Sequence, residues 1–463
     1  MKFHRYSLLF AIALISFQNS KAQGQIKAEW SKNFKITLNS INKAIDLQVD
    51  SLGNSFVLMQ SWTPDSVKQI VLVKYDAEGT LIWQRIYDHS SHGDDIPASF
   101  AIDDFGNIWI CGITKTTDLN GNFLVVRFST DGVQDVDFTY DGRDHLFDAA
   151  NAISTDKFGN AYAGGYTTSK DSTLDAFLVK LKPDGKLEWK RNYVSAKVDI
   201  INSLVVDDSS NIYVSGVTNN GQRSSDIFIQ KYNSGGDLKW QRIYDGVFGE
   251  RDMSNIITRD DSMHVYITGF VNHTSDRSDL PVLKYSRNGL LLAESFFNGV
   301  AADCFATSLR IEKDKIILTG NKVDYTTNVS ESLYLKYDKA GKEKLFIKSK
   351  NDFKFLSTEV IGSHELLFGT ELTHPESTLI PFIAEVDTLP RFKWTYSDST
   401  LYGVAHFIKV VVNKNKIYFL ADDAGDASGT VILAKYDLTF PPEKKELINY
   451  RKQINKSGVQ KNK

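Results

Sequence analysis

The chain has 463 residues, a formal net charge of -3 at pH 7, and a composition that is 42% hydrophobic and 12% aromatic. This amount of apolar material can bury a large core, which excludes a disordered chain. The small net charge gives no reason to expect nucleic acid or an anionic membrane as a partner.

The first 22 residues are predicted to be a signal peptide. Lys2 and Arg5 give a positively charged start, an apolar run follows from Leu8 to Phe17, and Ser20-Lys21-Ala22 forms a small-x-small cleavage site. The apolar run is too short to span a bilayer, and no later stretch of the sequence has the apolar length of a membrane helix. We expect cleavage after Ala22 and a monomeric protein that is secreted or periplasmic.

A ten-residue element recurs along the chain and decides the fold class. Its copies are "DSLGNSFVLM" from Asp50, "DDFGNIWICG" from Asp103, "DKFGNAYAGG" from Asp156, "DDSSNIYVSG" from Asp207 and "DDSMHVYITG" from Asp260, at spacings of 51 to 53 residues. Decayed copies end at Gly320, Gly369 and Ala421, which makes eight units. Self-similarity at such a period indicates a repeat architecture.

The Asp-x-x-Gly-Asn part of this element is predicted to be a tight hairpin turn. Asp is favoured at the first position of a type I turn, and Gly at the last position, where φ is positive. Asp104-Phe105-Gly106 also matches the magnesium-binding Asp-Phe-Gly of protein kinases, but the sequence lacks the Gly-rich loop and the His-Arg-Asp that accompany it. A turn made several times over indicates a structural role, and calcium binding by the turn carboxylates is the functional alternative.

A second hairpin follows in each unit. It reads "LVKYDAEGTLIW" up to Trp83, "LVKLKPDGKLEW" up to Trp189 and "IQKYNSGGDLKW" up to Trp240. Two alternating apolar runs flank a four-residue turn that ends in Gly. Four short antiparallel strands in every unit, with no helical period between them, predict an all-β fold: a single β-propeller of four-stranded blades. We expect eight blades, with seven as the alternative.

The order of these residues resembles the SBBP-type β-propeller repeat of exported bacterial proteins. "DKFGNAYAGGYT" followed by "DAFLVKLKPDGKLEW" is the best copy, and the resemblance extends from about Trp30 to Tyr436. Units six to eight depart from it because they lack the Gly-Asn turn. The resemblance implies a propeller and export, and it transfers no catalytic residues.

The two ends of the repeat array predict how the ring closes. A Trp-bearing fourth strand, "KAEWSKNF", precedes the first complete unit, and the last unit ends near Leu438 without one. We therefore expect the strand around Trp30 to complete the last blade and to protect its edge. The propeller then covers residues 23–440, and the basic segment 441–463 is a solvated tail or a short helix. Cys111 and Cys304 lie in distant units, so two free thiols are expected.

The strand order assigns the loops to two faces of the disc. Both tight turns of each unit lie on one face, the tight-turn face. The longer loops and the blade connections lie on the other, the loop-rich face, where a rigid scaffold usually presents binding groups. Trp62, in "QSWTPDS", is expected on a loop, where it stacks on a sugar ring or covers its own blade. The candidate ligand-binding residues are Trp62, His89, His92, Asp94, Asp95, Asp141, Arg143, Asp144 and His145, and a third connection offers Glu250, Arg251 and Asp252.

An Asp stands just before the expected inner strand in five units: Asp95, Asp148, Asp199, Asp252 and Asp303. We expect these residues to form an arc at the channel mouth and to accept backbone N–H bonds at the blade connections, because a residue repeated in every unit serves the unit. The alternative is a divalent cation shared by Asp148, Asp199, Asp252 and Asp303. The His and Asp residues of the first two connections could also ligate a metal.

Two functions fit these patterns. The first is an exported, non-enzymatic propeller, without a cofactor, that binds a protein or a carbohydrate on its loop-rich face. The second is a propeller-fold polysaccharide lyase or hydrolase that uses His89, His92, Arg143 or His145 as acid, base or metal ligand. The sequence contains no Gly-x-Ser-x-Gly elbow, no His-Glu-x-x-His and no phosphate-cradling Gly loop, so the first function is favoured.

Overall fold

The computed structural model describes residues 25–440 except for 37–39, 64–66, 90–91, 116–119, 220, 222–223, 247–248, 275–276, 299–301, 325–326, 328, 350–352, 374–377, 387–391, 398–404 and 424–428. The predicted signal peptide and the basic tail lie outside the described residues. Every regular element in the described part is a β-strand. None of this part forms a helix that could span a membrane.

The described strands form eight blades of four antiparallel strands, and the strands of each blade run in order from the innermost to the outermost. Blades one to four are β2 (Ile41–Val49), β3 (Ser55–Trp62), β4 (Gln69–Tyr75) and β5 (Leu81–Tyr87); β6 (Asp95–Ile102), β7 (Ile108–Lys115), β8 (Gly121–Phe128) and β9 (Gln134–Tyr140); β10 (Ala149–Thr155), β11 (Ala161–Thr168), β12 (Leu174–Leu181) and β13 (Leu187–Tyr193); β14 (Val198–Val206), β15 (Ile212–Asn219), β16 (Asp226–Tyr232) and β17 (Leu238–Tyr244). Blades five to eight are β18 (Asp252–Arg259), β19 (Val265–Thr274), β20 (Arg277–Tyr285) and β21 (Leu291–Phe297); β22 (Ala302–Ile311), β23 (Lys315–Asp324), β24 (Val329–Asp338) and β25 (Glu343–Ser349); β26 (Phe353–Ile361), β27 (His364–Thr373), β28 (Thr378–Val386) and β29 (Phe392–Ser397); β30 (Ala405–Asn413), β31 (Lys416–Asp423), β32 (Thr430–Thr439) and β1 (Gln25–Phe34).

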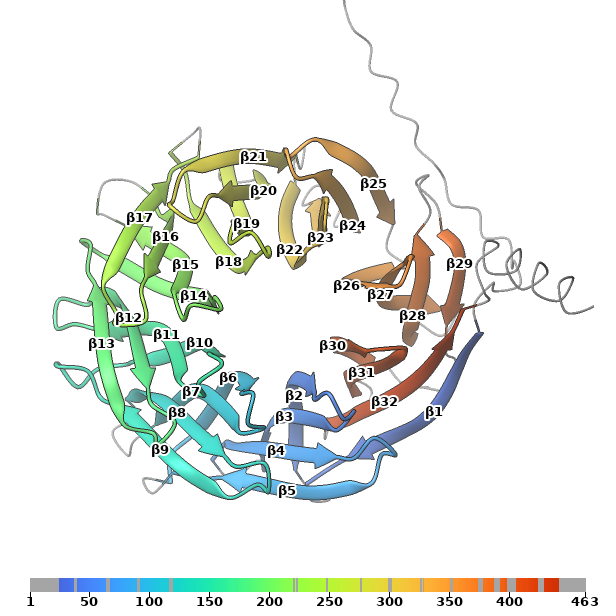
Figure 1. Ribbon diagram of the computed structural model, residues 1–463, viewed down its shortest axis with the longest axis horizontal. Helices are drawn as coiled ribbons and strands as arrows, with labels where there is room; N and C mark the ends of the chain where they lie inside the picture. Colours follow the sequence, from blue (N-terminus) through green and yellow to red (C-terminus); the bar gives the residue numbers. More distant parts are fainter. Residues whose placement is uncertain are drawn as a thin grey trace, which may run out of the picture.

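The blades stand radially around a central axis, with the first strand of each blade innermost (Figure 1). Blades three and four are joined by a single parallel pair, Leu174 with Val198. The fold is therefore the predicted β-propeller, and the described strands give eight blades.

The N-terminal strand closes the ring, as predicted. In Figure 1 the blue β1 lies along the red β32, and the two strands pair antiparallel from Gln25 with Thr439 to Phe34 with Val431. The carboxylate of Glu29 in β1 forms ion pairs with Lys416 in β31 and Lys435 in β32. Strand pairing and these ion pairs thus join the two ends of the propeller, so that β1 covers the edge that β32 would otherwise expose.

The Asp-x-x-Gly-Asn turns have the predicted structural role. Asp103 Oδ1 accepts the backbone N–H of Phe105 and of Asn107, Gly106 has a φ of 81°, and the Asn107 side chain donates back to Asp103. The indole N–H of Trp109 donates to Asp103 Oδ2 over 3.2 Å. Equivalent backbone bonds recur at Asp50, Asp156, Asp207 and Asp260. Since the turn itself uses the carboxylate oxygens, the turn explains the repeat without calcium.

The hydrophobic core lies between neighbouring blades. Phe56 and Leu72 of the first blade, for example, pack with Phe100 and Ile110 of the second. Each blade alone is a thin sheet, so its apolar faces can be buried only by its neighbours. Cys111 and Cys304 are buried free thiols, as predicted.

Candidate functional site

Trp62 lies in a strand and not on the predicted loop. It is the last residue of β3 and pairs with Ile41 of β2, which satisfies its backbone and extends the ladder. The ring is half-buried, and the Lys68 ammonium lies 5.8 Å from its centroid. The backbone N–H of Lys68 donates to Asp94 Oδ1 over 3.0 Å, and Lys115 Nζ lies 3.1 Å from Asp94 Oδ2. The structure thus joins Trp62 to the first blade connection through Lys68.

A backbone N–H bond and two nearby ammonium groups keep Asp94 ionised. Burial raises the pKa of Asp94, but the hydrogen bonds from Lys68 and Lys115 outweigh burial and hold the pKa below its usual value. An aromatic ring, two ammonium groups and one ionised carboxylate therefore lie side by side on the loop-rich face. We refer to Trp62, Lys68, Asp94 and Lys115 as the Trp62 cluster.

The two predicted histidine-bearing connections are built alike. His92 Nδ1 lies 3.2 Å from Asp88, and His145 Nδ1 lies 2.6 Å from Asp141, four residues earlier in each case. Both histidines are exposed and have a positive φ, 52° and 55°. The hydrogen bond and charge of Asp141 raise the pKa of His145. Each histidine therefore pairs with its own carboxylate.

These connections do not form the metal site that their residue types suggested. Among the described residues, the His and Asp side chains of the two connections do not converge into a group of three ligand atoms. Arg143 is exposed, and Asp144 accepts the backbone N–H of Lys170 over 2.9 Å. His89 is half-buried, and its backbone N–H donates to Asp95 over 2.8 Å.

The aspartates at the start of the inner strands accept backbone N–H bonds, as predicted. Asp95 bonds to His89, Asp148 to Gly142 and Thr168, Asp199 to Ser195, and Asp252 to Gly246 and Asn272. These four are at most 1% exposed, whereas Asp303 is half-buried. Among the described residues, the carboxylates of Asp148, Asp199, Asp252 and Asp303 do not converge into one group that could hold a shared cation. Each of the first four is held inside its own blade connection.

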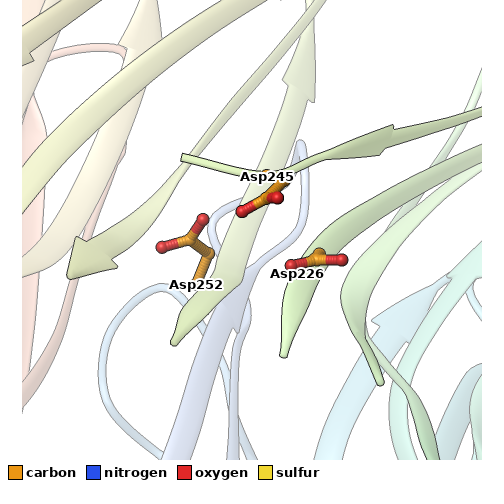
Figure 2. A group of neighbouring side chains, drawn as sticks. All are labelled: Asp226, Asp245 and Asp252. Carbon is orange, nitrogen blue, oxygen red and sulfur yellow. The ribbon is translucent and has the colours of Figure 1, made fainter. Parts of the chain in front are cut away.

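A different group of three carboxylates does converge. Figure 2 shows Asp226 at the start of β16, Asp245 just after β17 and Asp252 at the start of β18, with side chains directed toward one another. One oxygen from each lies within 4.8 Å of the others. Burial, and secondarily the neighbouring carboxylates, raise the pKa of Asp226 to about 6 and that of Asp252 to about 7. We call this group the Asp226 cluster. Its carboxylates repel one another at neutral pH.

The Asp226 cluster has the ligand chemistry of a calcium site but not a complete ligand set. Carboxylate oxygens are the ligands that hard divalent cations prefer, and calcium takes six to eight of them. Both carboxylate oxygens of Asp252 already accept N–H bonds, from Gly246 and Asn272. A cation held here would therefore depend mainly on Asp226 and Asp245 and on further oxygen ligands.

Sequence reasoning missed Asp226 and Asp245, although part of the signal was present. "YDGVFGERD" aligns with "YDHSSHGDD" and "YDGRDHLFD", so Asp245 corresponds to Asp88 and Asp141. At the position of His92 and His145 it has Gly249, and Asp245 therefore lacks the histidine partner. Asp226 belongs to another strand, and only the folded sheets place it beside this connection.

No family model matches the chain, and no curated protein matches it. Solved structures that resemble it include the β-propeller domain of the Trilobed protease from Pyrococcus furiosus, at 8% identity and a TM-score of 0.43, over 76% of this chain and 97% of that one. Drosophila Plexin A in complex with Semaphorin 1b matches at 9% identity and a TM-score of 0.41, over 88% and 87%. A protein of unknown function from Dyadobacter fermentans matches at 9% and 0.39, over 89% and 99%. At these identities and TM-scores, the similarities do not indicate a function for this chain.

Proposed function

We propose that this chain is an exported, monomeric, non-enzymatic β-propeller of the SBBP type that binds a protein or a carbohydrate on its loop-rich face. The observation that carries the proposal is the Trp62 cluster. Its half-buried indole lies beside ammonium and carboxylate groups, which is the combination that recognises a sugar ring or a peptide: a flat apolar surface with charged donors and acceptors around it.

The neighbouring connections add exposed groups to the same face. His92, Arg143 and His145 are exposed, and each stands on a short connection held in place by a buried aspartate. Rigid loops that present polar side chains lose little conformational entropy on binding. The polar groups of the tight turns, in contrast, are used by the turns themselves.

Ligand capture on immobilised protein, from a glycan array and from secreted proteins, tests the proposal. We expect Trp62→Ala, His92→Ala and Arg143→Ala to reduce capture at least tenfold with an unchanged melting temperature. Phe105→Ala and Phe158→Ala are matched controls, because these two rings are exposed on the tight-turn face. Loss of capture in the controls, with full capture in the first three variants, would place the site on the tight-turn face and contradict the proposal.

The second candidate is the lyase or hydrolase, and the Asp226 cluster is the one observation that favours it. A metal-assisted enzyme would hold a cation there and position a substrate nearby. Elemental analysis of the purified protein separates the two candidates. A stoichiometric metal that chelator removes, and that Asp226→Asn and Asp245→Asn abolish, would favour the enzyme. Protein without metal, yet competent for capture, would favour the binding protein.

A further inference from the structure

Four blade boundaries of the described structure contain an indole ring in the same place. Trp30, Trp83, Trp189 and Trp240 lie on fourth strands, each opposite a lysine of the third strand. Each indole N–H donates to a backbone carbonyl in the tight turn of the next blade, over 3.0 to 3.3 Å. Each ring also covers the glycine two residues further along that turn. The ring therefore closes the outer part of these boundaries.

The boundary between blades five and six has the same lysine and the same turn carbonyl, but it has no indole. In β21 the residue opposite the third-strand lysine, Lys284, is Ala293. The Lys284 ammonium donates to the carbonyl of Lys339 over 3.1 Å, and this carbonyl corresponds to those that accept an indole N–H elsewhere. Ser295 Oγ donates to the carbonyl of Gly341 over 2.6 Å. A methyl group thus stands where the four tryptophan-bearing boundaries have a bicyclic ring.

A pocket of about 400 Å³ lies at this boundary. Tyr337 and Gly341 line it, and their strand pairing makes them the counterparts of Tyr285 and Gly289. At the preceding boundary, Trp240 stacks on Tyr285 with centroids 6.5 Å apart and covers Gly289. The pocket therefore overlaps the place that an indole takes between blades four and five.

The wall of this pocket is acidic. Glu294 and Glu343 are exposed along it, and the residues that line it include no lysine, arginine or histidine. Tyr337 is 2% exposed, and its hydroxyl has no hydrogen-bond partner within the described part of the chain. A buried polar group without a hydrogen-bond partner lowers the stability of the fold, and such a group usually bonds to water or to a ligand. The wall thus suits a positively charged ligand that can hydrogen-bond.

We propose that this pocket binds a cationic indole, that is, an indole ring that carries an ammonium group. The ring takes the place that tryptophan side chains take at the four boundaries with Trp30, Trp83, Trp189 and Trp240, and its N–H donates to the carbonyl of Lys339. Glu294 and Glu343 attract the ammonium group. The pocket volume is within the range of small-molecule sites, about 300–1,000 Å³. This site is on the outer edge of the disc and does not depend on the ligand of the loop-rich face.

Titration calorimetry of the full chain with tryptamine tests the proposal. We expect one binding site with a dissociation constant below about 1 mM. Indole-3-acetate, which reverses the charge, and phenethylamine, which lacks the indole N–H, should each bind at least tenfold more weakly. No saturable heat with tryptamine, or equal affinity for all three compounds, would overturn the proposal.

A filling substitution gives an independent readout. Ala293→Trp places the indole in the pocket from within the chain, so it should abolish tryptamine binding and raise the melting temperature by a few degrees, roughly 2–4 °C. Leu290→Trp, at a 65% exposed position three residues away, is the matched control and should change neither. Glu343→Gln should weaken tryptamine at least threefold with little effect on uncharged indole. Tryptamine binding that persists in a folded Ala293→Trp protein would refute the assignment.

Discussion

Asp156 and Asp260 begin tight turns, whereas Asp95, Asp148 and Asp252 end blade connections. All five are buried, yet the pKa is lowered in the two turn aspartates and raised in the three connection aspartates. Burial alone would raise the pKa of Asp260, but hydrogen bonds from His264, Tyr266 and Lys339 lower it to about 2. At the connections, burial raises the pKa of Asp148 to about 6 and that of Asp252 to about 7, since fewer donors oppose it. The number of donors around a buried carboxylate decides its charge state.

This difference separates the two faces of the propeller. On the tight-turn face, a saturated carboxylate holds the hairpin, and for Asp260 one further donor, Lys339, comes from the next blade. On the loop-rich face, the connection aspartates hold the backbone with one or two N–H bonds and lie close to further charged groups. The second arrangement costs stability near neutral pH, and groups of this kind are common where a protein binds or reacts.

The largest expected effect is the loss of a turn carboxylate. Asp156 accepts backbone N–H bonds from Phe158 and Asn160 and the hydroxyl proton of Tyr162. Asp156→Ala should lower the free energy of unfolding by about 2–4 kcal/mol, because several buried donors lose their partner at once. Urea unfolding followed by tryptophan fluorescence measures the change. Lys157→Ala in the same turn is the control, and an equal loss in both variants would contradict a specific role for the carboxylate.

The next effect is a dependence of stability on pH that the connection aspartates dominate. Asp95, Asp148 and Asp252 have pKa values raised to about 6, 6 and 7, so the folded chain binds protons that the unfolded chain has released. Their stabilising contribution is complete below about pH 4 and is lost as the pH rises through 6 to 7. Asp260, with its lowered pKa, acts in the opposite sense: its contribution is lost only as the pH falls from about 4 toward 2.

We therefore expect the free energy of unfolding to be greatest near pH 4 and to fall by several kcal/mol by pH 7.5. Urea unfolding at pH 5, 6, 7 and 8 measures this fall. Rising stability across the same range would mean that the connection carboxylates are ionised in the folded protein, and the contrast between the two faces would then be lost.

A smaller effect distinguishes repulsion in the Asp226 cluster from cation binding. Asp245 is exposed and lies near Asp226 and Asp252 without a histidine partner. In metal-free buffer at pH 7.5, Asp245→Asn should raise the melting temperature by about 1–2 °C, because it removes one of three like charges. Asp141→Asn is the matched control: it removes the carboxylate that pairs with His145 and should lower the melting temperature slightly. A lower melting temperature for Asp245→Asn, together with a calcium-dependent rise in the wild-type protein alone, would show that a cation uses the cluster.

The repeat pattern predicted the architecture because every unit contains the same sequence signals for turns and strands. Asp and Gly at fixed spacing specify the turns, and alternation specifies the strands, so eight blades and the closing role of β1 could be inferred from the residues alone. Substituted positions did not hide the pattern: Ser210 and Met263 replace the turn Gly and still adopt a positive φ, 56° and 63°.

The sites were harder to predict because they depend on contacts between units. The sequence predicts a loop at Trp62, because nothing in "QSWTPDS" shows that Ile41 pairs with it. Asp226 and Asp252 are 26 residues apart in sequence and meet only where two blades join. The pocket beside Ala293 follows from one missing ring, and comparison of the fourth strands in sequence could have found that absence but not the acidic wall around it.

The smallest expected effect tests the backbone of the connections. His92 has a φ of 52°, and this backbone conformation is higher in energy for a residue with a side chain than for glycine. The aligned position in the connection between blades four and five is Gly249, with a φ of 61°. His92→Gly relieves this strain but removes the exposed ion pair with Asp88, which contributes little in water. We expect the melting temperature to stay within about 1 °C of the wild-type value, or to rise by that amount, while ligand capture falls. His92→Ala keeps the strain and should be the less stable of the two. If both variants instead lost several degrees, His92 would be holding the connection in place, and its assignment to the binding surface would fail.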